Sequence, residues 1–333
     1  MNCRGCLKEV QEELLCNKCR KELFDGKKVN FKLDFASPVF EDDTALLENI
    51  KHISISGVQV KYSIKLEKEN LILTESGGQY IVKPVPAGSF KNLDQAPANE
   101  HLTMQIARQV YKINTAACAL IYFKDDSPAY ITRRFDIKSN GSHIQQEDFA
   151  QLAQLSKHNA GENFKYDTSY EAAADLIKKH VASYQTEMEV YFKIVLFNYL
   201  FSNGDAHLKN FSIYLTDDGD YRLTPAYDLL NTKIHIAQDT DVALTDGLFK
   251  DDFETESFKH NAFYAFDDFL EFGKRIGISE TRTHKLINGF LNSQDEVFRL
   301  ISNSFLNTES KERYTSLYKD KLNAINYSYT ASE

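Results

Sequence analysis

FSNGDAHLKN, residues 201–210, is the stretch that decides the fold we predict. Residues 187–201 are largely apolar and predict a helix, and residues 211–215 predict a short strand. Asn203 and Gly204 end the helix, so the polar side chains that follow lie on a loop between two buried elements. Catalytic groups are often placed on such loops. A loop also uses Asp and Asn for its own turns, so for this stretch alone both interpretations stay open.

The polar residues in and after this loop have the order that phosphoryl transfer requires. Asp205 is placed to accept the proton of an attacking hydroxyl. Asn210 and Asp228 can offer oxygen atoms to the magnesium ion that bridges nucleotide phosphates. This order of side chains favours a kinase-like site.

Composition and charge limit the class of protein. The chain has 333 residues, of which 42% are hydrophobic and 26% charged, as in an ordinary globular protein with two or three domains or lobes. The net charge of −9 argues against a protein that is basic throughout and coats nucleic acid. No apolar run approaches 18 residues, and the N-terminus has no basic start followed by an apolar core. We therefore expect no membrane span, no secretory signal and a cytoplasmic location.

Four cysteines form two Cys-x-x-Cys pairs near the N-terminus. Cys3 and Cys6 are followed, after nine intervening residues, by Cys16 and Cys19. Such pairs usually present four thiolates to a structural Zn²⁺, although the gap is shorter than the commonest spacing. Free or redox-active thiols are the main alternative, and disulfides are the weaker one. We predict a zinc module at residues 1–26.

A glycine-containing turn between predicted strands is a candidate phosphate contact. Residues 53–61 contain Ser56 and Gly57, and apolar runs at 62–66 and 71–73 follow. The backbone N–H groups of such a turn can bind phosphate, although the stretch taken alone favours a plain β-turn. The turn lacks the three glycines of a kinase glycine-rich loop.

A lysine on a strand and a glutamate on a helix are expected to pair. Lys83 lies on the predicted strand 80–84, and Glu100 precedes a helical pattern at 102–110 with Asn99 as its N-cap. The pair resembles the Lys–Glu ion pair of kinases. Alternatively, Glu100 is a carboxylate favourably placed in the first turn of a helix.

The remaining pattern predicts a second, helical lobe. Residues 138–141 break the polarity pattern, so we place a β-rich lobe at 27–140 and a mostly helical lobe at 141–333. The fold class is α+β, a bilobal protein-kinase-like fold. We expect further strands at 119–123, 129–135 and 221–224, and further helices at 148–157, 170–180, 263–276, 280–292 and 295–305.

Six blocks together resemble the HipA family of bacterial toxin–antitoxin serine/threonine kinases. They are residues 54–61, 80–84, 99–100, 134–136, 203–210 and 227–228. The chain resembles the shorter branch of the family, which lacks an extra N-terminal domain. Where the family commonly has an acidic residue at the start of the hinge, this chain has Arg133.

The resemblance implies a role for each matching residue. Asp205 would be the catalytic base, Asn210 and Asp228 would hold Mg²⁺, and Ser54 or Ser56 would be autophosphorylated, which would inhibit by repelling the ATP phosphates. The implied ATP contacts are Ser56, Gly57, Val58, Gln59, Val60, Lys61, Lys83, Glu100, Arg133, Arg134, Phe135, Asp136, His207, Leu208, Lys209, Asn210, Tyr227 and Asp228.

The resemblance also implies a function and partners. A HipA-like toxin kinase transfers the γ-phosphoryl group of ATP to a Ser or Thr of a protein, typically an aminoacyl-tRNA synthetase, and so stops translation. A helix-turn-helix antitoxin binds the toxin, and contact with DNA is indirect, through that complex. Two alternatives remain: a small-molecule phosphotransferase of the aminoglycoside or choline kinase type, and a pseudokinase that only binds nucleotide. A substrate screen and an ATP-turnover assay would separate them.

Overall fold

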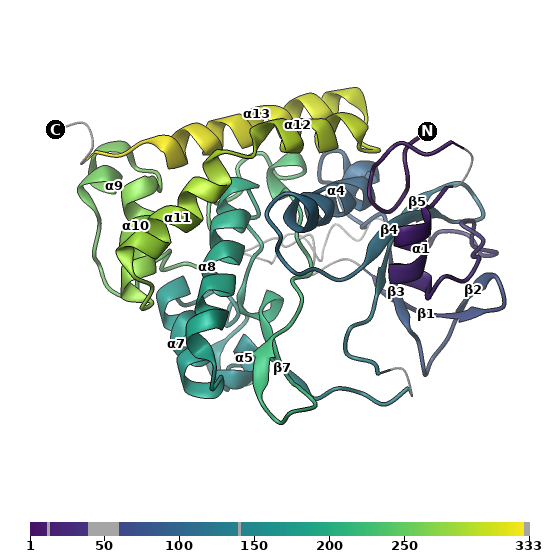
Figure 1. The fold of residues 1–333 in the computed structure, drawn as a ribbon, viewed down its shortest axis with the longest axis horizontal. Coiled ribbons are helices and arrows are strands. Elements are labelled where there is room, and N and C mark those ends of the chain that lie inside the picture. Colours follow the sequence, from purple (N-terminus) through teal and green to yellow (C-terminus); the bar gives the residue numbers. More distant parts are fainter. Residues whose placement is uncertain (12–13, 39–59, 139–140, 330–333) are drawn as a thin grey trace.

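The computed structural model describes residues 1–11, 14–38, 60–138 and 141–329. A sheet-rich part holds the N-terminal elements and a helical part holds the C-terminal ones (Figure 1). This mixed architecture agrees with the predicted fold class. Of the predicted turn within 53–61, residues 53–59 lie outside the described residues. In the described parts of the chain, no helix is both long and apolar enough to cross a membrane.

The sheet-rich part is built on an antiparallel sheet with the strand order β2-β1-β3-β5-β4. Its strands are β1 (Tyr62–Glu67), β2 (Asn70–Leu73), β3 (Tyr80–Pro84), β4 (Cys118–Tyr122) and β5 (Pro128–Arg133). This part also contains two short helices, α1 (Asn17–Phe24) and η1 (Leu93–Gln95), and one longer helix, α4 (Ala96–Gln109).

Alternation along the central strands sends their side chains to two different cores. Val82 and Ile131 are paired across β3 and β5 and pack, fully buried, with the N-terminal segment residues Leu23 and Phe24. Tyr130, which precedes Ile131 on β5, belongs to a second hydrophobic core, and α4 and the helical part contribute most of that core. Since successive side chains of a strand point to opposite faces, Lys83, paired with Tyr130, lies on the α4 side.

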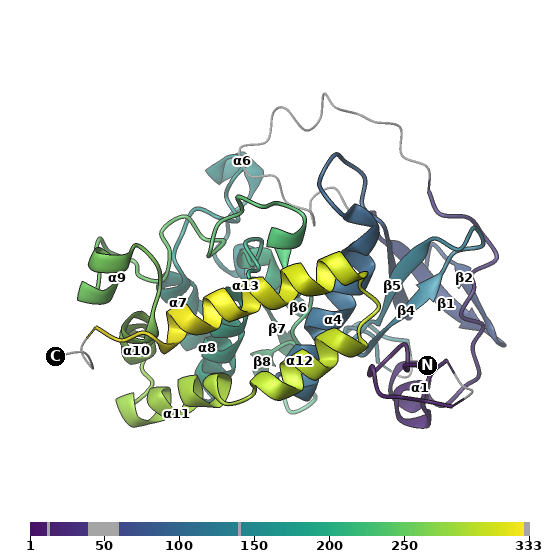
Figure 2. The same ribbon diagram turned by 90° about the horizontal axis from the view of Figure 1, so that it is seen from above.

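The helical part surrounds α8, which spans Tyr184–Leu200 and is apolar on nearly every side (Figures 1 and 2). Phe192 on α8 stacks on Phe272, and Phe201 just after it stacks on Tyr318. Most of its residues from Glu187 onward are buried, which explains why the sequence shows no clear polar face. The other elements are β6 (Gln146–Asp148), α5 (Phe149–Leu152), α6 (Lys157–Ala160), α7 (Tyr170–His180), η2 (Leu208–Asn210), β7 (Ser212–Leu215), β8 (Tyr221–Leu223), η3 (Thr232–Ile234), α9 (Glu256–Asn261), α10 (Phe266–Arg275), α11 (Glu280–Leu291), α12 (Gln294–Asn303) and α13 (Thr308–Asn326).

Two local predictions are wrong. Asn99 is not an N-cap: α4 begins at Ala96, with Pro97 in its first turn, and Asn99 is buried inside the helix. There its amide group exchanges hydrogen bonds of 2.8 and 3.1 Å with the backbone of Asn231. The predicted helix 148–157 is instead the end of β6 and the short α5, which Asp148 caps, and Gln154 with a left-handed φ of 57° separates α5 from α6, which begins at Lys157.

The helix α13, for which no prediction was made, runs along the helical part with one end beside α4 (Figure 2). It packs against α8, α10, α11 and α12, and α12 contacts α4. The Thr103 hydroxyl on α4 lies 2.9 Å from the Tyr314 hydroxyl on α13. α4 is therefore held from the helical side as well as from the sheet.

The core of the helical part gives a stability prediction. Phe269 is fully buried against Tyr199 and Phe192. Phe269→Ala should lower the free energy of unfolding by about 3–5 kcal/mol, because it removes apolar contacts and leaves a cavity. Urea unfolding followed by circular dichroism measures this. The control Leu73→Ala, which truncates a side chain that is 48% exposed, should change it by no more than about 0.5 kcal/mol. Equal effects would contradict the assigned core.

Candidate active site

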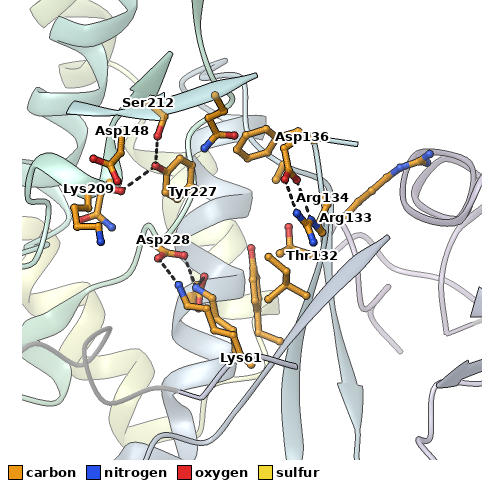
Figure 3. A pocket seen from close by; sticks show the side chains of 18 of the residues that line it. Lys61, Thr132, Arg133, Arg134, Asp136, Asp148, Lys209, Ser212, Tyr227 and Asp228 are labelled. Carbon is orange, nitrogen blue, oxygen red and sulfur yellow. Dashed lines mark hydrogen bonds and ion pairs between the residues drawn. The ribbon is translucent and has the colours of Figure 1, made fainter. Parts of the chain in front are cut away.

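A cavity of about 670 Å³ lies between the sheet and the helical part (Figure 3). Its size is in the range of small-molecule and cofactor pockets. The residues that line it come from β3, α4, β5, the segment after β5, β6, α5, the loop before α7, η2, β7 and the segment after β8. Elements far apart in the sequence thus contribute to a single pocket.

Lys83 is the centre of a buried ionic cluster in this cavity. Its ammonium group lies 2.6 Å from a Glu100 carboxylate oxygen and also pairs closely with Asp228. Lys61 pairs with the other Asp228 oxygen at 3.2 Å (Figure 3). Lys83 and Glu100 are each only 3% exposed, so the charges need one another. The predicted Lys83–Glu100 ion pair is confirmed, and Asp228 is its third member.

The ionic cluster also moves the pKa values of its members. Burial lowers the pKa of Lys83, but Asp228 and Glu100 outweigh it and raise that pKa above its usual value. Burial would raise the pKa of Asp228, yet Lys83 and Lys61 hold it well below the usual range. Burial raises the pKa of Glu100 in spite of Lys83. Asp228 therefore stays negatively charged in spite of its burial.

Asp228 and Asn210 are the side chains that could hold a metal ion beside a phosphate. Both line the cavity, and carboxylate and amide oxygens are ligands that Mg²⁺ accepts. Asp228 has a φ of 55°, in the left-handed region, which costs a non-glycine residue about 1–3 kcal/mol. The tertiary contacts of the ionic cluster hold it in that conformation. Strain of this kind is concentrated at functional sites.

Asp205 lies beside the cavity and not among the residues that line it. It is buried, and its Oδ1 atom accepts a hydrogen bond of 2.7 Å from the Tyr166 hydroxyl. His207 Nε2 lies 3.8 Å from the same oxygen. The Gly204 N–H donates to Thr232 Oγ1 at 2.9 Å, and a Cβ atom at Gly204 would overlap the Asp239 carboxylate. The loop is therefore shaped by close contacts that need glycine there.

The segment after β5 is shaped by two arginines that point in different directions (Figure 3). Arg134 makes two hydrogen bonds, of 3.0 and 2.5 Å, to Asp136. Arg133 makes two, of 2.6 and 3.0 Å, to Asp25, next to the end of α1. Arg133, which stands where an acidic residue was expected, thus attaches the N-terminal segment to the sheet.

Twelve of the predicted site residues line the cavity, and others do not. Asp205, Val60 and Leu208 are not among the lining residues, and the structure does not describe Ser54, Ser56, Gly57, Val58 or Gln59. The lining residues that were predicted are Lys61, Lys83, Glu100, Arg133, Arg134, Phe135, Asp136, His207, Lys209, Asn210, Tyr227 and Asp228.

Sequence reasoning missed other residues of the site. Lys165, Gln146, Asp148 and Thr132 line the cavity, and Tyr166 contacts Asp205 from behind it. None of these residues belongs to a local sequence motif. Lys165 and Tyr166 are a charged and an aromatic residue side by side between two predicted helices, which is only a weak indication of a functional site.

The four N-terminal cysteines come together as a possible metal site. Their sulfur atoms all lie within 4.8 Å of one another. The Cys16 N–H donates to Cys3 Sγ at 3.2 Å, and a Cβ atom at Gly5 would lie 2.8 Å from Cys19 Sγ. The cluster contains no disulfide. Four sulfur ligands in one tight cluster fit a structural Zn²⁺.

The cysteine cluster is attached directly to α4, the helix that carries Glu100. The buried His101 ring donates from Nε2 to the Gly5 carbonyl at 2.7 Å, and the Gln109 amide donates to the Cys6 carbonyl at 2.8 Å. The Leu120 N–H of β4 donates to the Arg4 carbonyl at 3.1 Å. The N-terminal segment therefore braces both α4 and the sheet.

Comparisons with known proteins place the chain in a family. The family model described as the HipA-like C-terminal domain matches residues 53–298. The chain belongs to this family. A Haemophilus influenzae protein named "Putative kinase" is 26% identical over 320 residues, which are 91% of this chain and 90% of that protein. "Putative kinase Y4dM" of Sinorhizobium fredii is 30% identical over 225 residues, 61% of this chain and 52% of that protein.

Two solved structures share the fold. One is HipA of Shewanella oneidensis MR-1, solved with HipB and its operator DNA: the TM-score is 0.60 and the identity 21%, over 81% of this chain and 63% of the HipA chain. The other is the Helicobacter pylori proinflammatory kinase CtkA, with a TM-score of 0.50 and 14% identity, over 79% of this chain and 93% of that chain. This chain therefore spans less than two thirds of the length of that HipA.

The ionic cluster gives a prediction that does not depend on activity. Lys83→Met should lower the free energy of unfolding by about 3–5 kcal/mol, because it leaves the Glu100 carboxylate buried without its cation. The double variant Lys83→Met with Glu100→Met should recover most of that loss. Chemical unfolding of the three proteins measures both steps.

The matched control is an exposed pair on β1. Lys65 and Glu67 lie 2.7 Å apart with both side chains in contact with solvent. Lys65→Met should change the free energy of unfolding by no more than about 1 kcal/mol. A double variant as unstable as Lys83→Met would contradict the ion-pair explanation.

Proposed function

We propose that this protein is an ATP- and Mg²⁺-dependent kinase that transfers the γ-phosphoryl group to a Ser or Thr hydroxyl of a protein. The observation that carries the proposal is the cluster of Lys83, Glu100 and Asp228 at one cavity into which Asn210 also opens. A strand lysine, a helix glutamate and a metal-binding aspartate in this arrangement are the parts that kinases use on nucleotide phosphates. Family membership and the fold of CtkA support the same reading.

Each part of the cavity has a task in the proposed reaction. Lys83, held by Glu100, would contact the nucleotide phosphates, and Asp228 with Asn210 would hold Mg²⁺, which neutralises phosphate charge when bound. Asp205, oriented by Tyr166, would accept the proton of the attacking hydroxyl. Burial keeps the Asp205 loop away from bulk water, which limits hydrolysis.

The family suggests how such a kinase would be used. The likeness to a HipA solved with HipB and operator DNA supports a helix-turn-helix antitoxin as partner, with DNA contacted through that complex. The proposed target is an aminoacyl-tRNA synthetase, whose phosphorylation would stop translation. Autophosphorylation of Ser54 or Ser56 would switch the kinase off by placing negative charge where the ATP phosphates bind.

The proposed chemistry predicts different defects for two aspartates. Asp205→Asn should reduce phosphoryl transfer at least about 10³-fold and leave Mg·ATP affinity within about threefold, since it removes only the base. Asp228→Asn should weaken Mg²⁺-dependent ATP binding about tenfold or more. Intact-mass spectrometry after incubation with Mg·ATP and isothermal titration calorimetry measure the two effects. Asp217→Asn, at a side chain that is 83% exposed, is the control.

The outcomes separate the alternatives. Phosphate gained by the parent at Ser54 or Ser56, and absent in Asp205→Asn, supports the proposal. ATP consumption that needs an added aminoglycoside or small alcohol would instead indicate a small-molecule phosphotransferase. Nucleotide binding without any turnover would indicate a pseudokinase and end the kinase proposal.

We propose that the cysteine cluster holds one structural Zn²⁺. The protein purified under reducing conditions should contain about one zinc per chain, and a chelator strong enough to remove it should lower the melting temperature. Removal should also increase proteolysis of residues 1–38, because the brace on α4 and β4 is built on the cluster. Metal analysis that finds no bound zinc would refute this proposal. Cys118→Ser, outside the cluster, should leave the zinc content unchanged.

A further inference from the structure

Lys165 lines the cavity but belongs to none of the sequence motifs that resemble a kinase site. Lys61 and Lys83 both pair with carboxylates of the ionic cluster. Lys165 also lines the cavity, but among the described residues it has no carboxylate within 4 Å. Its close partners are the His207 imidazole and the Tyr166 ring, 4.9 Å away, and the Asp205 carboxylate acts on it only at longer range. A partly buried ammonium group with no carboxylate in direct contact suits an anion supplied by a ligand.

The structure fixes where the Lys165 ammonium lies. Its Nζ atom is 2.8 Å from His207 Nε2, and that nitrogen is 3.8 Å from the Asp205 Oδ1 atom. An ammonium group can only donate hydrogen bonds, so His207 Nε2 is the acceptor in this contact.

The backbone around Lys165 is attached to the loop that carries Asp205. The Leu208 N–H donates to the Lys165 carbonyl at 3.0 Å, and the next residue, Tyr166, donates its hydroxyl to Asp205 at 2.7 Å. The Tyr166 carbonyl in turn accepts from the Thr245 N–H at 3.0 Å. The ammonium is thus held beside the base by fixed contacts, as an electrostatic catalyst must be.

We propose that Lys165 is a catalytic residue that binds the phosphoryl group during transfer, on the side of the acceptor hydroxyl. The proposal rests on the proposed kinase function. In the step, the bond from the γ-phosphorus to the oxygen shared with the β-phosphate breaks and a bond to the hydroxyl oxygen forms. The hydroxyl proton goes to Asp205, and ADP leaves. Lys165 compensates the negative charge on the non-bridging oxygens of the transferred group from the acceptor side, while Lys83 contacts the nucleotide phosphates from its place beside Glu100 and Asp228.

Three substitutions test the charge separately from the structural contact. Lys165→Met removes both, Lys165→Gln keeps a hydrogen-bond donor for His207 without charge, and Lys165→Arg keeps the charge. We expect kcat to fall about 10²–10³-fold in the Met and Gln variants and to recover at least tenfold in the Arg variant. KM for ATP should change much less than kcat. Lys157→Met, which removes an exposed lysine paired with Glu162, is the control and should retain parental activity.

Binding measurements make the test independent of turnover. Titration calorimetry with Mg·ADP and with the Mg²⁺ complex of a non-hydrolysable ATP analogue should show that Lys165→Met weakens the triphosphate about tenfold and the diphosphate less than twofold. Equal losses for both, or recovery of kcat in the Gln variant, would show that Lys165 only supports His207 and would overturn the proposal. If the parent itself shows no phosphoryl transfer, the kinase proposal fails, while the triphosphate–diphosphate difference still decides whether Lys165 binds the terminal phosphate.

Discussion

The rest of the structure depends on the buried ammonium group of Lys83, which needs the carboxylates of Glu100 and Asp228 beside it. Lys83 lies on a central strand, Glu100 on the helix behind it and Asp228 on a segment that follows the loop of Asp205. Removing such charges from water costs several kcal/mol per ion unless they pair closely. The sheet, α4 and the helical part can bury these groups only when all three are in register. The same cluster that constrains the fold presents lysines and a carboxylate to the cavity, the groups to which the proposed function assigns phosphate and metal binding.

The helix α4 is the element on which this register depends, and it is held from several directions. Tyr314 of α13 contacts it from the helical part, while His101 and Gln109 attach it to the cysteine cluster. Arg133 adds a second attachment, from β5 to Asp25. The N-terminal segment is therefore part of the framework of the site, although none of its cysteines faces the cavity. A catalytic arrangement needs such support to hold its geometry.

The sequence predicted the parts of the site that depend on local order. The pairing of Lys83 with Glu100 was predicted from a strand and a following helix, and the structure contains it. The N-cap at Asn99 was wrong because tertiary contacts with Asn231 make burial of that amide favourable inside a longer helix. The helix α13 was not predicted, although its buried residues Tyr314, Leu317, Tyr318 and Ile325 recur at helical spacing and its charged residues lie between them. Local propensity is a weak guide where packing against distant elements decides the outcome.

The sequence by itself determined the family, the loop that carries Asp205 and the paired cysteines, because these features lie within short stretches whose residue types have few physical explanations. Only the tertiary structure decided which distant side chains complete the site. Lys165 and Tyr166 lie about forty residues before the loop they brace, and Arg133 turns away to Asp25, more than a hundred residues earlier in the chain. Contacts at such separations follow from how whole elements pack, and no local pattern of residues records them.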